Sequence, residues 1–421
     1  MNAARDIHLR KAVLRALHRP LSTLLSTVSA QLLVLLSSPA FLSPAIPTPQ
    51  APHPNPTQMH ALGYATLAGE LLDTFDDLRL GIDTDSRADG LKPIRDGLTA
   101  LVNRVINPLA AGIVDDLMRL IAALEFAPAP NGPSSNSASK VSLTPKASTS
   151  QHPSITALQA VIPVYASTLS LYFATSASQA TLATHLIALV WSGLVALSNR
   201  FPSPSTPPSS PATLPAVTKK GRGTTPPTTP PSSRFMLKLP PSRPPSPHAE
   251  RAPPSVITDT RMLYDLLRSL PRPGAEKERL RFAREAVDDA FTQLQSLISL
   301  FELVSTCGPV LDHKDLEEST ADISTLIALP VLFNAYVFPS HGSSARTVAS
   351  MLGLSEERYK AECLAKPARA EEYTISVGKR LLDILGQQTG VPLSPAAGAV
   401  ANWLTMEVES AEADAEDDAV V

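Results

Sequence analysis

The chain has few of the residues that cross-link small proteins or bind structural metals. Its 421 residues include two cysteines, Cys307 and Cys363, which lie far apart and form no CxxC pair. A disulfide framework needs several paired cysteines, and a structural zinc site needs clustered ligands. The sequence therefore argues against both and fits a reducing compartment.

Charged and aromatic residues are also scarce, at 18% and 5% of the chain. With 43% hydrophobic residues there is enough apolar material for a core, and that core must be built mainly of Leu, Ala, Val and Ile. This composition favours helices. We find no strong period-2 stretch and no Asn-Gly hairpin signal, so the predicted fold class is all-α.

Motifs that carry catalysis are missing as well. The sequence has no HExxH metal motif, no glycine-rich phosphate loop and no Ser-centred nucleophile elbow. We therefore predict no catalytic, cofactor-binding or metal-ligating residue and no cofactor. The interpretation that remains is a non-enzymatic interaction or scaffold protein, which binds protein partners through helical surfaces.

Proline, by contrast, is abundant, and 17 of the 41 prolines lie between Phe201 and Pro254. Proline lacks the backbone N–H and restricts the residue before it, so this stretch cannot form a regular hydrogen-bonded ladder. It also has too few large apolar residues to offset the entropy of ordering. We predict two helical bundle-like domains joined by a long disordered Pro/Ser/Thr-rich tether, 201–254.

The same signals predict the remaining boundaries. The expected units are an N-terminal helical region 1–126 with a Pro-rich loop 38–57, a disordered loop 127–153, an apolar helix pair 154–200, a C-terminal helical domain 255–409 and an acidic tail 410–421. The helices we expect span 5–19, 21–36, 58–80, 91–126, 155–174, 181–198, 259–270, 275–305, 314–337, 344–352, 356–365, 370–388 and 395–408.

Two of these expectations are specific enough to be checked residue by residue. Pro20 suits the first turn of a new helix, so we expect a helix boundary there. In the helix 275–305, apolar residues recur every three or four positions. We expect Leu294, Leu297 and Phe301 in this stripe to be buried.

The tether carries the candidate regulatory sites. It has a net charge of +6, whereas residues 255–421 carry −11. Proline-directed kinases read Ser/Thr-Pro dipeptides in extended chain, so such a kinase is an expected partner. The candidate phosphorylation sites are Ser203, Thr206, Ser210, Thr225, Thr229 and Ser246. Within the tether, Arg234 followed by Leu237 and Leu239 resembles a kinase docking peptide.

Residues 346–361 resemble a helix-turn-helix pattern. Gly353 permits a sharp turn, Leu354 can fill the hinge, and Ser355 can cap the second helix. Phosphate attraction normally dominates affinity for DNA. Because this part of the chain is strongly acidic, we expect the supersecondary structure but not nucleic-acid binding.

Two alternatives stay open beside the scaffold interpretation. Residues 20–69 and 147–199 contain no Asp, Glu, Lys or Arg. The second of these stretches could therefore make 155–198 a membrane hairpin or a buried helix pair. Segment 1–40 is rich in Arg, Leu, Ala and Ser, with Asp6 as its only acid, so it could be a mitochondrial presequence or an ordinary first helix. The second alternative is an all-α metal-dependent enzyme of isoprenoid type, whose candidate ligands are Asp73, Asp76, Asp77, Asp115 and Asp116.

These interpretations differ in the location they imply. The scaffold interpretation predicts a cytoplasmic or nuclear protein, and the long Pro/Ser/Ala-rich insertions suggest a eukaryotic one. The membrane alternative predicts a membrane-associated or mitochondrial protein.

Overall fold

The computed structural model describes residues 2–43, 46–80, 91–126, 151–200, 256–274, 278–307, 311–338, 347–387 and 394–420. The expected tether and most of the loop 127–153 lie outside these ranges. Within them the chain is helical and contains no strand, which confirms the all-α class with two helical parts.

The helical part before residue 201 consists of α1 (Asn2–Leu36), α2 (Pro56–Asp77), α3 (Lys92–Ala122), the short 3₁₀ helix η1 (Ala123–Glu125), α4 (Pro153–Tyr172) and α5 (Ser176–Ser198). The part after residue 255 consists of α6 (Val256–Arg268), α7 (Glu278–Thr306), α8 (His313–Thr320), α9 (Thr325–Leu332), a π-helical turn η2 (Phe333–Val337), α10 (Val348–Leu352), α11 (Glu356–Cys363), α12 (Pro367–Gln387) and α13 (Pro395–Val420).

Local sequence signals explain where many of these helices begin. At α2, the Asn55 side chain accepts a hydrogen bond from the Gln58 amide at 2.8 Å, and the Gln58 side chain accepts one from the Asn55 amide at 3.0 Å. Pro56 then occupies the first helical position, where its missing N–H costs nothing.

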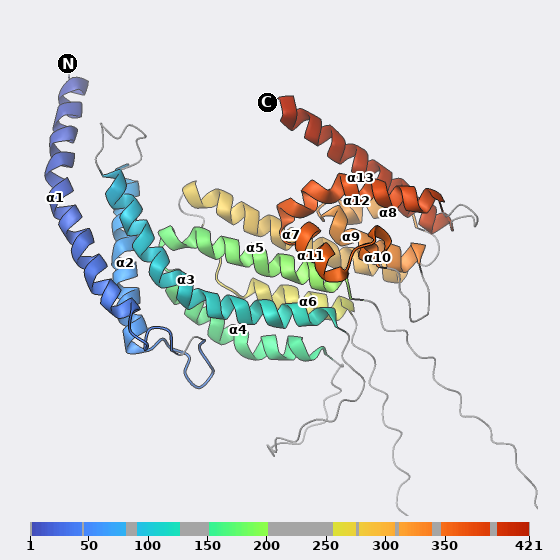
Figure 1. Cartoon of the computed structure of the whole chain (residues 1–421), viewed down its shortest axis with the longest axis horizontal. Helices are drawn as coiled ribbons and strands as arrows, with labels where there is room; N and C mark the ends of the chain where they lie inside the picture. The colour runs from blue at the N-terminus through green and yellow to red at the C-terminus, as the bar shows by residue number, and fades with distance from the viewer. Residues whose placement is uncertain are drawn as a thin grey trace, which may run out of the picture.

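The two helical parts pack against each other around α5. This helix packs mainly against α3 and α7, which come from opposite sides of segment 201–255 in the sequence (Figure 1). Buried side chains from both parts form one continuous hydrophobic cluster. α4 and α5, which we expected as a pair, each pack against α3 more than against one another.

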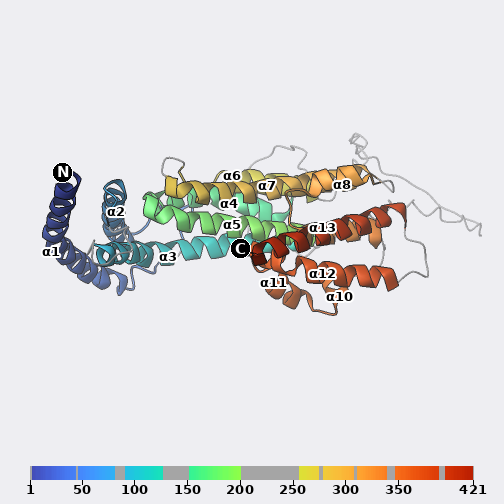
Figure 2. The ribbon, with the colours of Figure 1, turned by 90° about the horizontal axis from the view of Figure 1, so that it is seen from above.

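The molecule is elongated, with α1 at one end and the helices after α7 at the other (Figure 2). α1 packs on α2 and α3 by one face only, through Leu14, Val28 and Leu32. α13 begins at the end opposite α1 and runs back toward the middle of the molecule, where its last turns project from the body (Figure 1). Each terminal helix therefore leaves part of its surface uncovered.

The expected helix boundary at Pro20 is wrong, because α1 continues through this residue. Pro20 cannot donate to the carbonyl of Ala16, but its ring lies on the exposed side of the helix. Leu14 on one side of Pro20 and Val28 on the other are both buried in the same hydrophobic cluster, so both halves of α1 are held to the body.

Three further expectations need correction. The single helix 314–337 is divided into α8, α9 and η2: Ser324 leaves the helical conformation, with φ of −56° and ψ of 131°, before α9, and η2 follows α9 directly as a π-helical turn. The acidic tail is not a separate segment, since α13 continues through it as far as Val420. In α7, Leu294 and Leu297 are fully buried as predicted, but Phe301 is only partly buried, because its neighbour Leu300 takes the position that faces the core.

Candidate functional site

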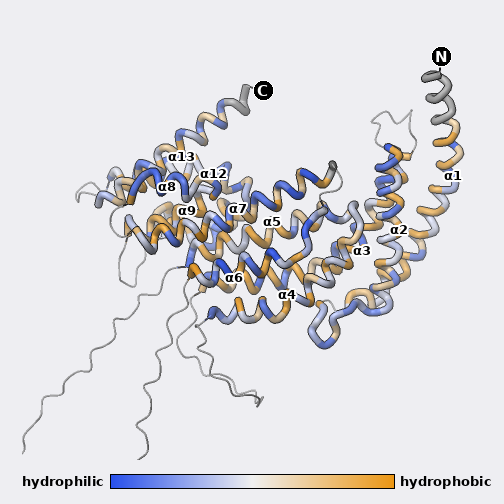
Figure 3. The backbone as a smooth tube through the Cα atoms, turned by 180° about the vertical axis from the view of Figure 1, so that it is seen from behind, coloured by the Kyte–Doolittle hydropathy of each residue, from blue (hydrophilic) through white to orange (hydrophobic). Residues whose placement is uncertain are grey.

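An uncovered apolar surface lies along α1. Val13, Leu17 and Leu24 are 48%, 38% and 40% exposed, and Leu33 and Val34 are more exposed still. At 3.6 residues per turn, Val13, Leu17 and Leu24 share one side of the helix, and we call these three residues the α1 outer surface. Apolar positions continue along the whole described length of this helix, which has neighbours on one side only (Figure 3).

Polar side chains between these residues carry no charge from Pro20 onwards. The Thr23 hydroxyl donates to the Arg19 carbonyl at 3.0 Å, and the Thr27 hydroxyl donates to the Thr23 carbonyl at 2.9 Å. Hydroxyl groups bonded in this way cost less to remove from water than free ones. Arg15 and Arg19 are the last two charged residues before this stretch, and both are exposed.

Within the described ranges, four helical segments could cross a membrane by length and composition: Ala12–Leu36, Lys92–Glu125, Pro153–Tyr172 and Ser176–Ser198. They differ in how many residues of their apolar window are buried inside the protein. This share is 44%, 39% and 56% in the last three segments and 11% in the α1 segment. α1 is therefore the apolar helix with the most surface left for another partner.

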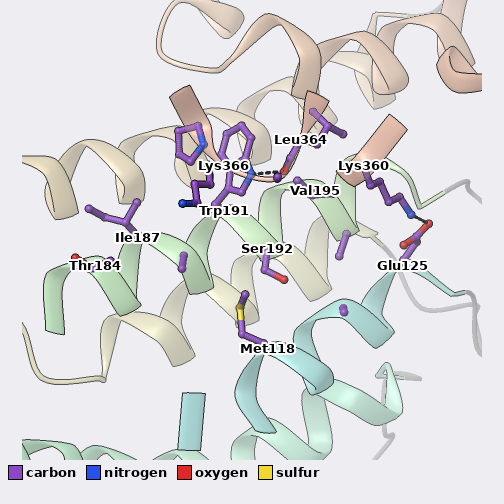
Figure 4. Close-up of a pocket in the computed structure, with 15 residues that line it drawn as sticks. Met118, Glu125, Thr184, Ile187, Trp191, Ser192, Val195, Lys360, Leu364 and Lys366 are labelled. Atoms are coloured by element: carbon purple, nitrogen blue, oxygen red, sulfur yellow. Dashed lines mark hydrogen bonds and ion pairs between the residues drawn. The ribbon is translucent and has the colours of Figure 1, made fainter. Parts of the chain in front are cut away.

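A groove of about 390 Å³ lies where the two helical parts meet. Its floor is α5, one wall comes from α3 and η1, and the other comes from the turn between α11 and α12 (Figure 4). The lining is mostly apolar, with Met118, Ile187, Trp191, Val195 and Leu364 among its residues. We call it the α5 groove.

Most of the polar groups around the α5 groove are bonded within the protein. The Trp191 indole N–H donates to the Leu364 carbonyl at 2.7 Å, which ties α5 to the C-terminal part. Lys360 forms an ion pair with Glu125 across the groove (Figure 4). Lys366 lies beside Trp191, is exposed, and forms no ion pair with any residue that the structure describes.

A buried ion pair holds the ends of segment 201–255 together. Arg200 and Asp259 are 3% and 1% exposed, and Arg200 Nη1 lies 2.5 Å from Asp259 Oδ2. The other carboxylate oxygen accepts a hydrogen bond from the His152 amide at 3.4 Å. Residues that border both segments outside the described ranges, 127–150 and 201–255, thus meet in one buried cluster.

The geometry at His152 favours a neutral ring. Nε2 lies 2.9 Å from the Phe126 carbonyl and therefore donates to it, while Nδ1 accepts from the Ser154 amide at 3.2 Å as the cap of α4. Burial lowers the pKa of His152 below its usual 6.5, and the nearby Arg200 lowers it further. Protonation of Nδ1 would remove the cap.

The candidate metal ligands do not converge. Asp73 accepts a hydrogen bond from Ser176, Asp76 pairs with Arg95, and Asp116 pairs with Arg119. Within the described ranges, no group of three His, Cys, Asp or Glu residues is placed to hold a metal ion. Asp73, Asp76 and Asp116 instead bond to neighbouring side chains on and between helices.

The helix-turn-helix geometry is confirmed. Gly353 adopts a left-handed conformation with φ of 75°, and the Ser355 hydroxyl accepts a hydrogen bond from the Arg358 amide at 3.3 Å. The cations of the second helix are already paired, Arg358 with Glu362 and Lys360 with Glu125. The helix-turn-helix segment positions one wall of the α5 groove, because this wall is the turn that follows α11.

Both cysteines are free thiols. Cys363 is buried, which raises the pKa of its thiol, and Cys307 is partly buried.

The regulatory sites stay predictions. The six Ser/Thr-Pro sites and the docking peptide Arg234, Leu237 and Leu239 lie outside the described residues.

Sequence reasoning missed Trp191, Lys366 and the Arg200–Asp259 pair. One signal was available for Arg200, because it ends a stretch of more than fifty residues without a formal charge. A single charged residue next to a buried helix needs a partner of opposite charge, but the sequence does not identify that partner. For Trp191 and Lys366, we find no local pattern that marks them.

Known proteins offer no analogy for these surfaces. No family model, no curated protein and no solved structure matches the chain.

Proposed function

We propose that this protein is a non-enzymatic interaction protein that works at a membrane surface and docks on anionic lipid through α1. The observation that carries the proposal is the exposure of apolar side chains along α1, the least covered of the apolar helices. Amphipathic helices that lie on membranes combine such side chains with arginine or lysine. α1 supplies Arg15 and Arg19 for this role.

The packing of α1 favours docking on the surface over insertion across the bilayer. Leu14, Val28 and Leu32 are buried against the body, so drawing α1 into the membrane would expose the side chains of α2 and α3 beneath them. Docking through the outer surface leaves those contacts intact. The bonded hydroxyls of Thr23 and Thr27 lower the cost of contact with lipid.

Flotation of the full chain with vesicles tests the proposal. We expect binding to vesicles that contain phosphatidylserine and weaker binding to neutral vesicles. The variant Val13→Ser/Leu17→Ser/Leu24→Ser should lose about 2–3 kcal/mol of binding free energy, because three apolar side chains no longer enter the membrane surface. This loss is roughly a 30- to 150-fold decrease in affinity. The variant Arg15→Gln/Arg19→Gln should lose about 2 kcal/mol of binding free energy on anionic vesicles and bind neutral vesicles like the unchanged protein.

The matched control is Phe282→Ser/Met406→Ser, which removes two exposed apolar side chains from helices outside α1. This variant should bind vesicles like the unchanged protein. Equal flotation of the α1 triple variant and the unchanged protein would overturn the assignment of α1. Resistance to carbonate extraction would replace surface docking with insertion.

Regulation through segment 201–254 is a second proposal, and the Arg200–Asp259 pair favours it. The residues that border that segment, Arg200 and Asp259, meet at one buried point on the body, and the part of the chain that follows is acidic. Each phosphate adds about −1.5 to −2 charges, and three or four phosphates would reverse the segment's charge of +6.

Replacing the six Ser/Thr residues by Glu or by Ala tests this second proposal. Partner binding by the two variants should differ at low salt and converge at high salt, because screening weakens the contact. Identical partner binding by both variants at low salt would contradict it.

A further inference from the structure

The α5 groove is a second surface with an uncovered apolar lining, and it differs from α1 in shape and charge. Its volume of about 390 Å³ falls within the roughly 300–1,000 Å³ of small-molecule sites. Two turns of a helix about 10 Å wide would occupy on the order of 850 Å³. The space between the walls is therefore that of a small-molecule site, and only one face of a partner helix could enter it.

The hydrogen bonding of the lining also disfavours an extended peptide. An extended chain carries an N–H and a carbonyl at each residue, and both need partners when they are buried. Here the Trp191 N–H is bonded to Leu364, the Thr184 hydroxyl to Ala180, and Lys360 to Glu125. An unbranched acyl chain needs no such partners.

The charged residues of the groove indicate the charge of the ligand's head group. The Glu125 carboxylate neutralises Lys360, whereas Lys366 has no carboxylate partner in the described part of the chain. Its ammonium group lies beside Trp191 on the groove wall (Figure 4). A ligand with one negative charge at the end of an apolar chain complements a single unpaired cation beside an apolar floor.

We propose that the α5 groove binds a long-chain fatty acid, with the carboxylate at Lys366 and the acyl chain along Ile187, Trp191 and Val195. The ligand would contact α5 together with the turn between α11 and α12, so it would bridge the two helical parts. This site is separate from α1 and does not depend on the proposed membrane docking.

Calorimetric titration of the full chain with dodecanoate below its micellar concentration tests the proposal. Dodecyltrimethylammonium, which has the same chain length and the opposite charge, is the matched ligand control. We expect one dodecanoate per chain and weaker binding of the cation. Lys366→Gln should weaken dodecanoate binding up to about fivefold and abolish the preference for the anion.

Two protein controls make the result specific. Lys314→Gln removes an exposed lysine on α8 and should leave dodecanoate binding unchanged. Ala188→Phe places a large side chain in the groove and should prevent binding, with circular dichroism confirming that the variant is folded. The α1 variant Val13→Ser/Leu17→Ser/Leu24→Ser should bind dodecanoate normally, which separates this site from membrane docking.

Three results would each overturn the proposal. They are binding of many dodecanoate molecules per chain, equal binding of the two amphiphiles by the unchanged protein, and unaltered binding by a folded Ala188→Phe variant.

Discussion

Removing the carboxylate of Asp259 should destabilise the whole molecule. Asp259 and Arg200 are almost completely buried, and their side chains are 2.5 Å apart. Asp259→Ala would leave the Arg200 guanidinium without a counter-charge and out of reach of water. Breaking a buried pair by removing one partner costs about 3–5 kcal/mol, and the hydrogen bond from the His152 amide would be lost as well.

Urea unfolding of the full chain at neutral pH measures this cost. The same helix, α6, supplies a matched control, because Arg261 pairs with Glu302 while the two side chains are 59% and 43% exposed. Since exposed ion pairs contribute at most about 1 kcal/mol, Arg261→Ala should lower the free energy of unfolding by less than that.

A double replacement separates the charge from the packing. Arg200→Met/Asp259→Leu removes both charges and keeps apolar volume, so it should be far less destabilising than Asp259→Ala alone. The reasoning would be refuted if Asp259→Ala cost no more than Arg261→Ala, or if the double replacement cost as much as the single one.

Three other predictions concern the core. Because the pKa of His152 is lowered in the folded state, the unfolded chain binds more protons below about pH 6.5; stability measured by urea unfolding should therefore fall with pH from about 7 to 5, and less so in a His152→Asn variant. Gly378→Ala should lower the free energy of unfolding by about 1–3 kcal/mol, because the added methyl group would collide with the Val408 side chain. Adding Val408→Ala to this variant should restore part of the loss. Leu297→Ala should lower the free energy of unfolding by about 2–5 kcal/mol, clearly more per carbon atom removed than Phe301→Ala, since Phe301 is only partly buried; equal losses per carbon atom removed would contradict the burial difference.

The positions of the helices could be read from the sequence because their signals are local. Apolar residues every three or four positions identified α7, and the Gly353 turn and the Ser355 cap were predicted from residue type alone. A proline can be read locally in two ways, as a first-turn residue or as an interior one. Pro20 is an interior residue because contacts on both sides of it keep α1 continuous.

The functional surfaces were harder to predict, because exposure depends on what packs nearby. α1 and α5 each contain a segment that is long and apolar enough to cross a membrane. The structure buries α5 between α3 and α7 but covers α1 on one side only. Length and apolar composition alone do not contain that difference.

The sequence by itself determined the helical class, the proline-rich segment 201–254 between two helical parts and the absence of recognisable catalytic motifs, because composition and short-range patterns suffice for these. Only the tertiary structure joined the two parts through Arg200 and Asp259 and placed Lys366 beside Trp191. Such contacts join residues that are about 60 to 170 positions apart. Their stability comes from burial and the exclusion of water, and no local pattern in the chain encodes either.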